Sequence, residues 1–271
     1  MEKFIDIFDE RIYFTMEDEK EDLPIFLFIH GFADRGLTIS PLKQLKNRKY
    51  KIATLDLPGS GKSSLKNNAS LEYFSKIVFK LIEKEFIDKE IYIISHSMGA
   101  IPGLFNLKVN DKVKHLFLLA PLNYNLLSIE NDLNSDIFKW LLPENENDAF
   151  DSLFNLVFEP NQNYINGINL LAKKIFDSID LRKQKFGFLV KEQILSKNYL
   201  NNQIRKLFDE NSNFTVIFGS EDKFVSKNQM LLLKKDRPDI KFFEIKKCGH
   251  AMFYQKAEEI NNIINEYLSN K

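Results

Sequence analysis

The chain has 271 residues, of which 44% are hydrophobic and 28% are charged, and its 38 basic residues balance 38 acidic ones. This composition predicts a globular chain long enough for one large domain. It excludes wholesale disorder and a protein that binds nucleic acid through a strong positive net charge. Acidic Glu2 and Asp6 lie where a signal peptide would be apolar, and no run reaches the roughly 20 apolar residues of a membrane-spanning helix. We therefore expect a cytoplasmic protein with no nucleic-acid partner and no stable membrane insertion. The single cysteine, Cys248, fits a reducing compartment.

The predicted strands begin with a β-hairpin, formed by residues 4–8 and 11–15. The apolar run Ile25–Ile29 follows, and its unbroken hydrophobicity is typical of a strand buried on both faces. Further runs of this kind cover residues 50–55, 91–94, 113–119, 214–218 and 240–245.

Helical patterns separate several of these strands. Apolar residues recur at helical spacing over residues 71–86, after the candidate N-cap Ser70, and again over residues 257–268. Strands that alternate with helices predict an α/β fold with a mostly parallel, doubly wound sheet flanked by helices.

One long segment, residues 122–211, breaks this alternation. It shows helical patterns and no convincing buried strand, and Asn and Asp cluster between the patterns as loops require. The patterns cover residues 133–142, 150–158, 168–176 and 186–195. We predict a core of residues 1–121 and 212–271, with residues 122–211 inserted as a helical cap over the carboxyl ends of the strands.

A short motif, Ser95-His96-Ser97-Met98-Gly99, follows the predicted strand 91–94 and precedes a segment that can open a helix. A serine with small residues two positions to either side, between a buried strand and a helix, is typical of the tight turn that exposes a nucleophilic hydroxyl. The usual motif begins with glycine, and here Ser95 takes that place. Strand geometry predicts that His96 faces away from Ser97.

Ser97 needs a base and an acid. Among the four histidines, His250 lies on the loop after the predicted strand 240–245, and Asp222 lies just beyond the strand 214–218. A carboxylate there can orient an imidazole that takes a proton from a serine. The non-catalytic alternatives are that His250 is an ordinary loop histidine and that Asp222 belongs to a solvated acidic turn. Gly31, after the strand 25–29, would let the Phe32 amide point at a substrate oxygen, with the Met98 amide as the second donor.

The glycine-rich segment 58–64 also invites a phosphate-loop interpretation. A Walker A motif needs glycine five positions before Gly61, and Asp56 occupies that position. We therefore predict a structural turn here rather than a nucleotide site.

Taken together, these residues resemble the α/β-hydrolase superfamily, particularly its capped esterase, lipase and peptidase-like members. The matching segments are His30-Gly31-Phe32, residues 56–63, Ser97-Met98-Gly99, residues 219–222 and Gly249-His250. The resemblance implies the fold and a set of roles. Ser97 is the nucleophile, His250 the general base and Asp222 its orienting acid. The Phe32 and Met98 amides form the oxyanion hole, and no metal or organic cofactor is needed.

We therefore expect a serine hydrolase that cleaves small or medium acyl esters, or lysolipids, through an acyl-enzyme on Ser97. Apolar cap residues could line the acyl site, unless they only form the cap's own core. They are Phe138, Leu141, Leu142, Phe154 and Phe158. A serine nucleophile argues against the haloalkane dehalogenases and epoxide hydrolases of this fold, which use aspartate. A carbon–carbon bond hydrolase, a peptidase, an acyltransferase and a non-catalytic binding protein stay open as alternatives.

Overall fold

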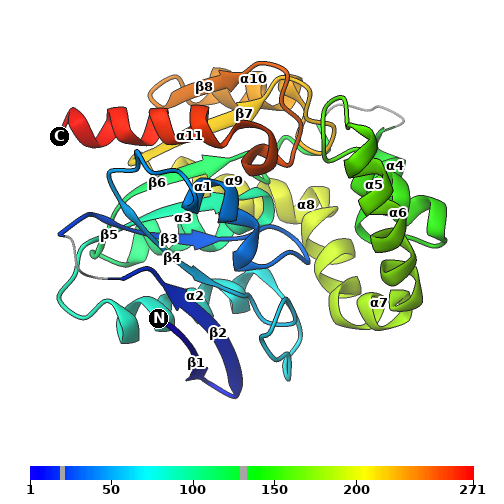
Figure 1. Ribbon diagram of the computed structural model, residues 1–271, viewed down its shortest axis with the longest axis horizontal. Coiled ribbons are helices and arrows are strands. Elements are labelled where there is room, and N and C mark those ends of the chain that lie inside the picture. Colours follow the sequence, from blue (N-terminus) through cyan, green and yellow to red (C-terminus); the bar gives the residue numbers. More distant parts are fainter. Residues whose placement is uncertain (19–21, 129–132) are drawn as a thin grey trace.

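An eight-stranded sheet forms the centre of the computed structural model, which describes residues 1–18, 22–128 and 133–271 (Figure 1). The strand order is β1-β2-β4-β3-β5-β6-β7-β8. The bounds are β1 (Glu2–Ile7), β2 (Glu10–Met16), β3 (Ile25–Ile29), β4 (Lys51–Leu55), β5 (Ile91–His96), β6 (Val113–Leu119), β7 (Phe214–Gly219) and β8 (Lys241–Ile245). β2 pairs antiparallel with β1 and β4, and the other pairs are parallel. The predicted mostly parallel sheet is confirmed.

Strand β3 shows why the sheet needs helices on both faces. Its residues Ile25, Leu27 and Ile29 belong to one apolar cluster, Phe26 and Phe28 belong to another, and all five are buried. Because neither face of the strand meets water, its sequence is apolar throughout instead of alternating.

Helices supply the two covering layers (Figure 1). α2 (Leu71–Glu85), α3 (Ala100–Val109) and α10 (Lys227–Asp236) bury apolar residues in the first cluster. α11 (Met252–Ser269) buries its apolar residues in the second cluster, together with the short η1 (Gly36–Ile39) and α1 (Ser40–Lys43). α2 starts where the sequence predicts, since the Ser70 hydroxyl accepts a hydrogen bond from the Tyr73 amide at 3.1 Å.

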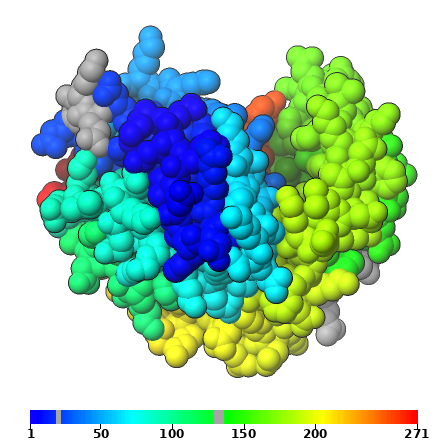
Figure 2. Space-filling view, turned by 90° about the horizontal axis from the view of Figure 1, so that it is seen from below, coloured from blue at the N-terminus to red at the C-terminus, as the bar shows by residue number. Residues whose placement is uncertain are grey.

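Between β6 and β7, the described residues carry helices and no strand. The helices are α4 (Leu133–Leu141), α5 (Glu146–Phe154), α6 (Gln162–Asp177), α7 (Ile179–Phe188), η3 (Leu189–Ile194), α8 (Lys197–Tyr199), η4 (Leu200–Ile204) and α9 (Arg205–Asp209). α4 to α7 stand beside the sheet in Figure 1, and Figure 2 shows a notch between the yellow-green part of this segment and the rest of the molecule. α9 packs against α3. The division into core and cap stays a prediction.

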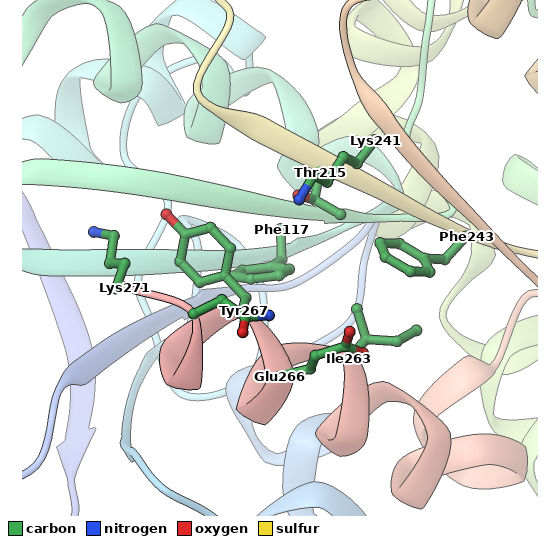
Figure 3. Close-up of a pocket in the computed structure, with 9 residues that line it drawn as sticks. Phe117, Thr215, Lys241, Phe243, Ile263, Glu266, Tyr267 and Lys271 are labelled. Atoms are coloured by element: carbon green, nitrogen blue, oxygen red, sulfur yellow. The ribbon is translucent and has the colours of Figure 1, made fainter.

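A cavity lies near the edge of the sheet where β7 and β8 begin (Figure 3). Thr215 and Lys241 line it from the starts of these strands, and Tyr267 and Lys271 line it from the end of the chain. The carboxyl ends of the parallel strands, where the candidate site residues follow, lie at the opposite edge. Among the described residues, no helix is both long and apolar enough to cross a membrane.

Candidate active site

Ser97 lies in the single turn that joins β5 to α3, formed by residues 97–99. Its φ angle of +52° is in the left-handed region, which a non-glycine residue adopts only when the surrounding structure imposes it. The turn packs tightly, because a Cβ atom on Gly99 would lie 2.5 Å from the Ile29 carbonyl oxygen. Ser97 is half-buried, whereas Ser95 and Met98 are buried. The turn therefore presents one hydroxyl to solvent.

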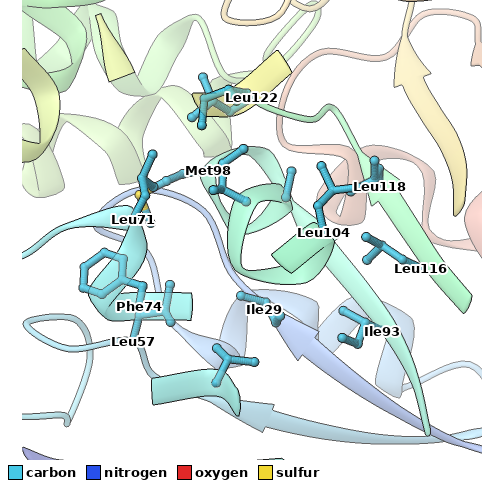
Figure 4. Close-up of a cluster of buried hydrophobic side chains, with 14 of the residues drawn as sticks. Ile29, Leu57, Leu71, Phe74, Ile93, Met98, Leu104, Leu116, Leu118 and Leu122 are labelled. Carbon is cyan, nitrogen blue, oxygen red and sulfur yellow. The ribbon is translucent and has the colours of Figure 1, made fainter. Parts of the chain in front are cut away.

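The Met98 side chain holds this turn to the core. It is buried in the same apolar cluster as Leu57, Leu71 and Leu122, and Figure 4 draws it beside Leu71. α3 begins directly after the turn, so the partial positive charge of its N-terminus lies beside Ser97. Within the described residues, the amides of Phe32 and Met98 donate no hydrogen bond to other protein groups.

Asp222 and His250 form a buried pair. The Oδ2 atom of Asp222 lies 2.7 Å from Nδ1 of His250, and the side-chain exposures are 0% and 5%. The other carboxylate oxygen accepts hydrogen bonds from the amides of Phe224 and Val225, at 2.8 and 2.9 Å. These bonds fix the carboxylate, which in turn holds the proton on Nδ1. Nε2 is then the ring nitrogen left to act as a base.

The loops after β7 and β8 meet, which is why residues 222 and 250 come together. The Glu221 amide donates to the Cys248 carbonyl at 3.0 Å, and the Ser220 amide donates to the Ile245 carbonyl at 2.9 Å. A Cβ atom on Gly219 would lie 2.2 Å from the Cys248 oxygen, so only glycine permits this approach.

His96 links the His250 loop to the turn that carries Ser97, a contact that the sequence did not predict. Its Nε2 atom donates to the His250 carbonyl at 2.9 Å, and the two ring centroids lie 4.7 Å apart. The ring of His250 also stacks on Phe224, at 4.9 Å. Burial, with a smaller contribution from the nearby His250, lowers the pKa of His96 to about 3. His96 is therefore neutral near pH 7 and acts through its hydrogen bond.

His30 anchors the loop that carries Phe32. Its Nε2 atom accepts a hydrogen bond from the Leu57 amide, so its Nδ1 atom carries the proton and donates to the Gly31 carbonyl, both at 2.8 Å. Burial lowers the pKa of His30, which keeps this arrangement neutral. Asp56 fixes the next turn by accepting from the amides of Gly36 and Lys62, at 2.7 and 2.8 Å. These contacts give the glycine-rich segment a structural explanation.

A cavity lies beside Ser97, and residues from distant parts of the sequence line it. The residues that line it are Phe32, Ser97, Met98, Leu122, Leu126, Ile137, Leu141, Ile194, Phe224 and Val225. Its walls are mostly apolar, as an acyl chain would require. Sequence reasoning missed Leu122 and Leu126, although they follow the end of β6 just as the other site residues follow the ends of their strands.

Of the five apolar residues expected to line an acyl site, Leu141 belongs to this cavity. The other four do not line it. Phe138 and Leu142 pack in the apolar core, and Phe154 stacks on Phe150 at 5.7 Å. The backbone amide of Phe158 donates a hydrogen bond to the Gln255 side chain at 3.1 Å, and its carbonyl accepts one from the same side chain at 2.8 Å. The part of the chain that the structure describes holds no cluster of three or more His, Cys, Asp or Glu that could bind a metal ion.

Residues 24–257 match the model of the alpha/beta hydrolase fold family, and the chain belongs to this family. It is 22% identical over 252 residues to a Mycoplasma pneumoniae protein provisionally named esterase/lipase 2, covering 90% of this chain and 89% of that protein. It is also 22% identical over 256 residues to the Escherichia coli K12 protein named 2-hydroxy-6-oxononadienedioate/2-hydroxy-6-oxononatrienedioate hydrolase, covering 88% and 82%. A crystal structure provisionally titled as an Acinetobacter baumannii lipase superposes with a TM-score of 0.81 at 18% identity, covering 100% of this chain and 91% of that one. The chain is thus an α/β hydrolase similar to proteins named as esterases and lipases.

Proposed function

We propose that this protein is a serine hydrolase that cleaves carboxylic esters through an acyl-enzyme on Ser97. The observation that carries the proposal is the buried 2.7 Å pair of Asp222 and His250, on a loop that is hydrogen-bonded to His96, the residue just before a serine held at positive φ on a strand–turn–helix. A structural histidine would not need a carboxylate fixed by two backbone amides on one side and an open ring nitrogen on the other.

In the proposed reaction, Nε2 of His250 takes the Ser97 proton as Oγ attacks the ester carbonyl. Asp222 holds the Nδ1 proton and stabilises the imidazolium ion. The oxyanion accepts hydrogen bonds from the free Phe32 and Met98 amides, and His250 then returns its proton to the leaving alcohol. Water, activated by the same histidine, releases the acid. The apolar cavity beneath residues 122–211, which we propose to be a cap, takes the acyl chain.

A carbon–carbon bond hydrolase is the second candidate, because one relative is named for the hydrolysis of dienedioates. Both reactions would use the same three residues, so substrate turnover separates them. A panel of p-nitrophenyl esters of graded chain length, beside a vinylogous diketone, should show turnover of the esters. If the protein turned over the diketone and none of the esters, carbon–carbon bond hydrolysis would replace ester hydrolysis as the proposed reaction.

A fluorophosphonate probe, which bonds covalently to an activated serine, tests the nucleophile. We expect wild type to label and Ser97→Ala to lose labelling, with ester turnover reduced by at least about 10⁴-fold. Ser95→Ala, the same change two residues away, should label as wild type does. Folded wild-type protein that fails to label, or equal labelling of Ser97→Ala, would overturn the proposal.

A further inference from the structure

Arg182 on α7 is a cation beside the Ser97 cavity. Its guanidinium carbon lies 5.1 Å from the centre of the Phe32 ring, and its Nε atom donates to the Leu141 carbonyl at 3.0 Å. Phe32 and Leu141 both line the cavity. The side chain is half-buried. The helix that carries it, α7, belongs to the yellow-green segment beside the notch in Figure 2.

The surroundings of Arg182 lack the carboxylate that desolvated arginines normally have. Arg48 and Arg237, whose side chains are mostly buried, lie 2.8 and 2.6 Å from a Glu and an Asp oxygen. Arg182 forms no ion pair with any residue that the structure describes, although removal from water lowers its pKa to about 10. A guanidinium that is partly removed from water, with no anion beside it among the described residues, loses hydration energy without the compensation of an ion pair.

The bond to Leu141 and the contact with Phe32 explain the position of the side chain but not its charge. An amide side chain could donate to the same carbonyl at a smaller desolvation cost. The Nη1 and Nη2 atoms have no hydrogen-bond acceptor among the described residues, and they are not sealed from solvent. Two parallel donors of this kind suit one planar anion.

We propose that Arg182 binds an anionic group, a carboxylate, on the part of the substrate remote from the scissile bond. This inference deepens the proposed function, because it names the substrate class of the same site as esters that carry a negative charge. The oxyanion forms at the Phe32 amide, and the remote anion binds the guanidinium that lies over the Phe32 ring, so Phe32 borders both subsites. An anion bound at Arg182 forms the ion pair that offsets the partial desolvation of the arginine.

Paired substrates test the subsite. p-Nitrophenyl monoesters of adipic, pimelic and suberic acids carry the remote carboxylate, and their methyl-capped counterparts are neutral. We expect wild type to prefer the charged member of at least one pair. Arg182→Gln should lower kcat/KM for that member by roughly 10- to 100-fold, mainly through KM, and leave its neutral counterpart within about twofold. Arg182→Lys should retain part of the preference for the charged ester, because lysine keeps the positive charge but lacks the two parallel N–H donors of arginine. Lys183→Gln, on the exposed neighbour, should change neither.

Binding without turnover separates this inference from the proposed function. In the Ser97→Ala background, calorimetry should show that monomethyl adipate binds at least about tenfold tighter than dimethyl adipate, and that adding Arg182→Gln removes the difference. Inorganic phosphate that competes more strongly than acetate would identify a phosphate rather than a carboxylate and overturn the assignment. Equal losses for charged and neutral esters in Arg182→Gln would show that the arginine only holds α7 in place. If wild type hydrolyses the charged and neutral esters equally well, the carboxylate subsite is ruled out and the esterase proposal still holds.

Discussion

The residues around Ser97 are small because three backbone segments converge on the turn. A Cβ atom on Gly99 would meet the carbonyl oxygens of Ile29 and His30 at 2.5 and 2.6 Å. A Cβ atom on Gly31 would meet the Ser97 Cβ at 3.2 Å. Backbone cannot move aside as a flexible side chain can, so these contacts fix where the Ser97 hydroxyl and the Phe32 amide lie.

Gly99→Ala should damage stability and reactivity together. The added methyl group must push β3 away from the turn, and overpacking of this kind costs about 1–3 kcal/mol. The same displacement moves the oxyanion donors, so the rate of fluorophosphonate labelling should fall by at least about tenfold. Urea unfolding and the labelling rate measure the two effects.

Gly167→Ala is the matched control, because a Cβ atom on Gly167 of α6 meets nothing within 4 Å. This change should raise the free energy of unfolding by up to about 1 kcal/mol, as alanine does in a helix, and leave labelling unchanged. If Gly99→Ala behaved like this control, the tight turn would not be what positions Ser97.

At the scale of single residues, the sequence predicted those that act through their own chemistry better than those that act through a neighbour. Ser97, Asp222 and His250 could be proposed because each follows a strand and carries a reactive group. The hydrogen bond from His96 to the His250 carbonyl could not, since strand alternation says nothing about a loop that arrives from residue 250. Arg182 was missed for a similar reason. Arg182 is of interest because no carboxylate among the described residues pairs with it, and only the folded structure shows this.

The bounds of the buried strands were predicted closely from the sequence. The bounds of the helices between β6 and β7 were predicted less well. α5 starts at Glu146 rather than at residue 150, because the Asn145 side chain caps it by accepting from the Asp148 amide at 2.9 Å. The helical pattern over residues 186–195 divides into the end of α7 and the π-helical η3. Apolar spacing does not distinguish these two hydrogen-bond patterns over so few residues.

The η3 segment is attached to the core through Gln193. This buried side chain accepts from the Leu71 amide at 2.8 Å and donates to a Glu72 oxygen at 2.6 Å, so it serves the open N-terminus of α2. Gln193→Leu keeps the volume and removes both bonds. We expect a loss of about 1–3 kcal/mol in the free energy of unfolding, because the Leu71 amide stays buried without a partner.

Gln184→Leu, the same substitution at an exposed site on α7, should change stability by less than about 0.5 kcal/mol. Urea unfolding of the two variants gives the comparison. Equal stability of both would mean that η3 is held to α2 by apolar contacts alone. A larger KM in Gln193→Leu, with kcat little changed, would further indicate that the attachment of this segment shapes the acyl cavity.

For the molecule as a whole, the parallel sheet explains why the site could be located from sequence at all. Carboxyl ends of parallel strands share one edge, so residues that follow β3, β5, β7 and β8 must meet there. The family match over residues 24–257 agrees with this organisation. The cavity could not be predicted in the same way, because it depends on how α4 and η3 pack over that edge.

The buried histidines predict how the stability of the whole molecule responds to acid. Burial lowers the pKa of His96 to about 3, and burial with the nearby Lys271 and Lys241 lowers that of His115 to about 4. An unfolded chain holds its histidines near 6.5, so between pH 6.5 and about 4 the unfolded state binds more protons. The stabilising contribution is therefore complete above pH 6.5 and is lost as the pH falls below it.

His115→Gln isolates one of these groups at the edge of the sheet remote from Ser97. His115 bonds to the Thr215 hydroxyl at 2.9 Å and stacks on Tyr267 at 4.3 Å, contacts that a glutamine can partly replace. The variant should be somewhat less stable than wild type at pH 8. Its free energy of unfolding should then fall less steeply between pH 6.5 and 4, by up to about 1.4 kcal/mol per pH unit. Lys114→Gln, which changes the charge of the neighbouring residue, should keep the wild-type slope. Parallel curves for wild type and His115→Gln in urea titrations would contradict the assignment, because a histidine that titrates equally in both states adds no slope.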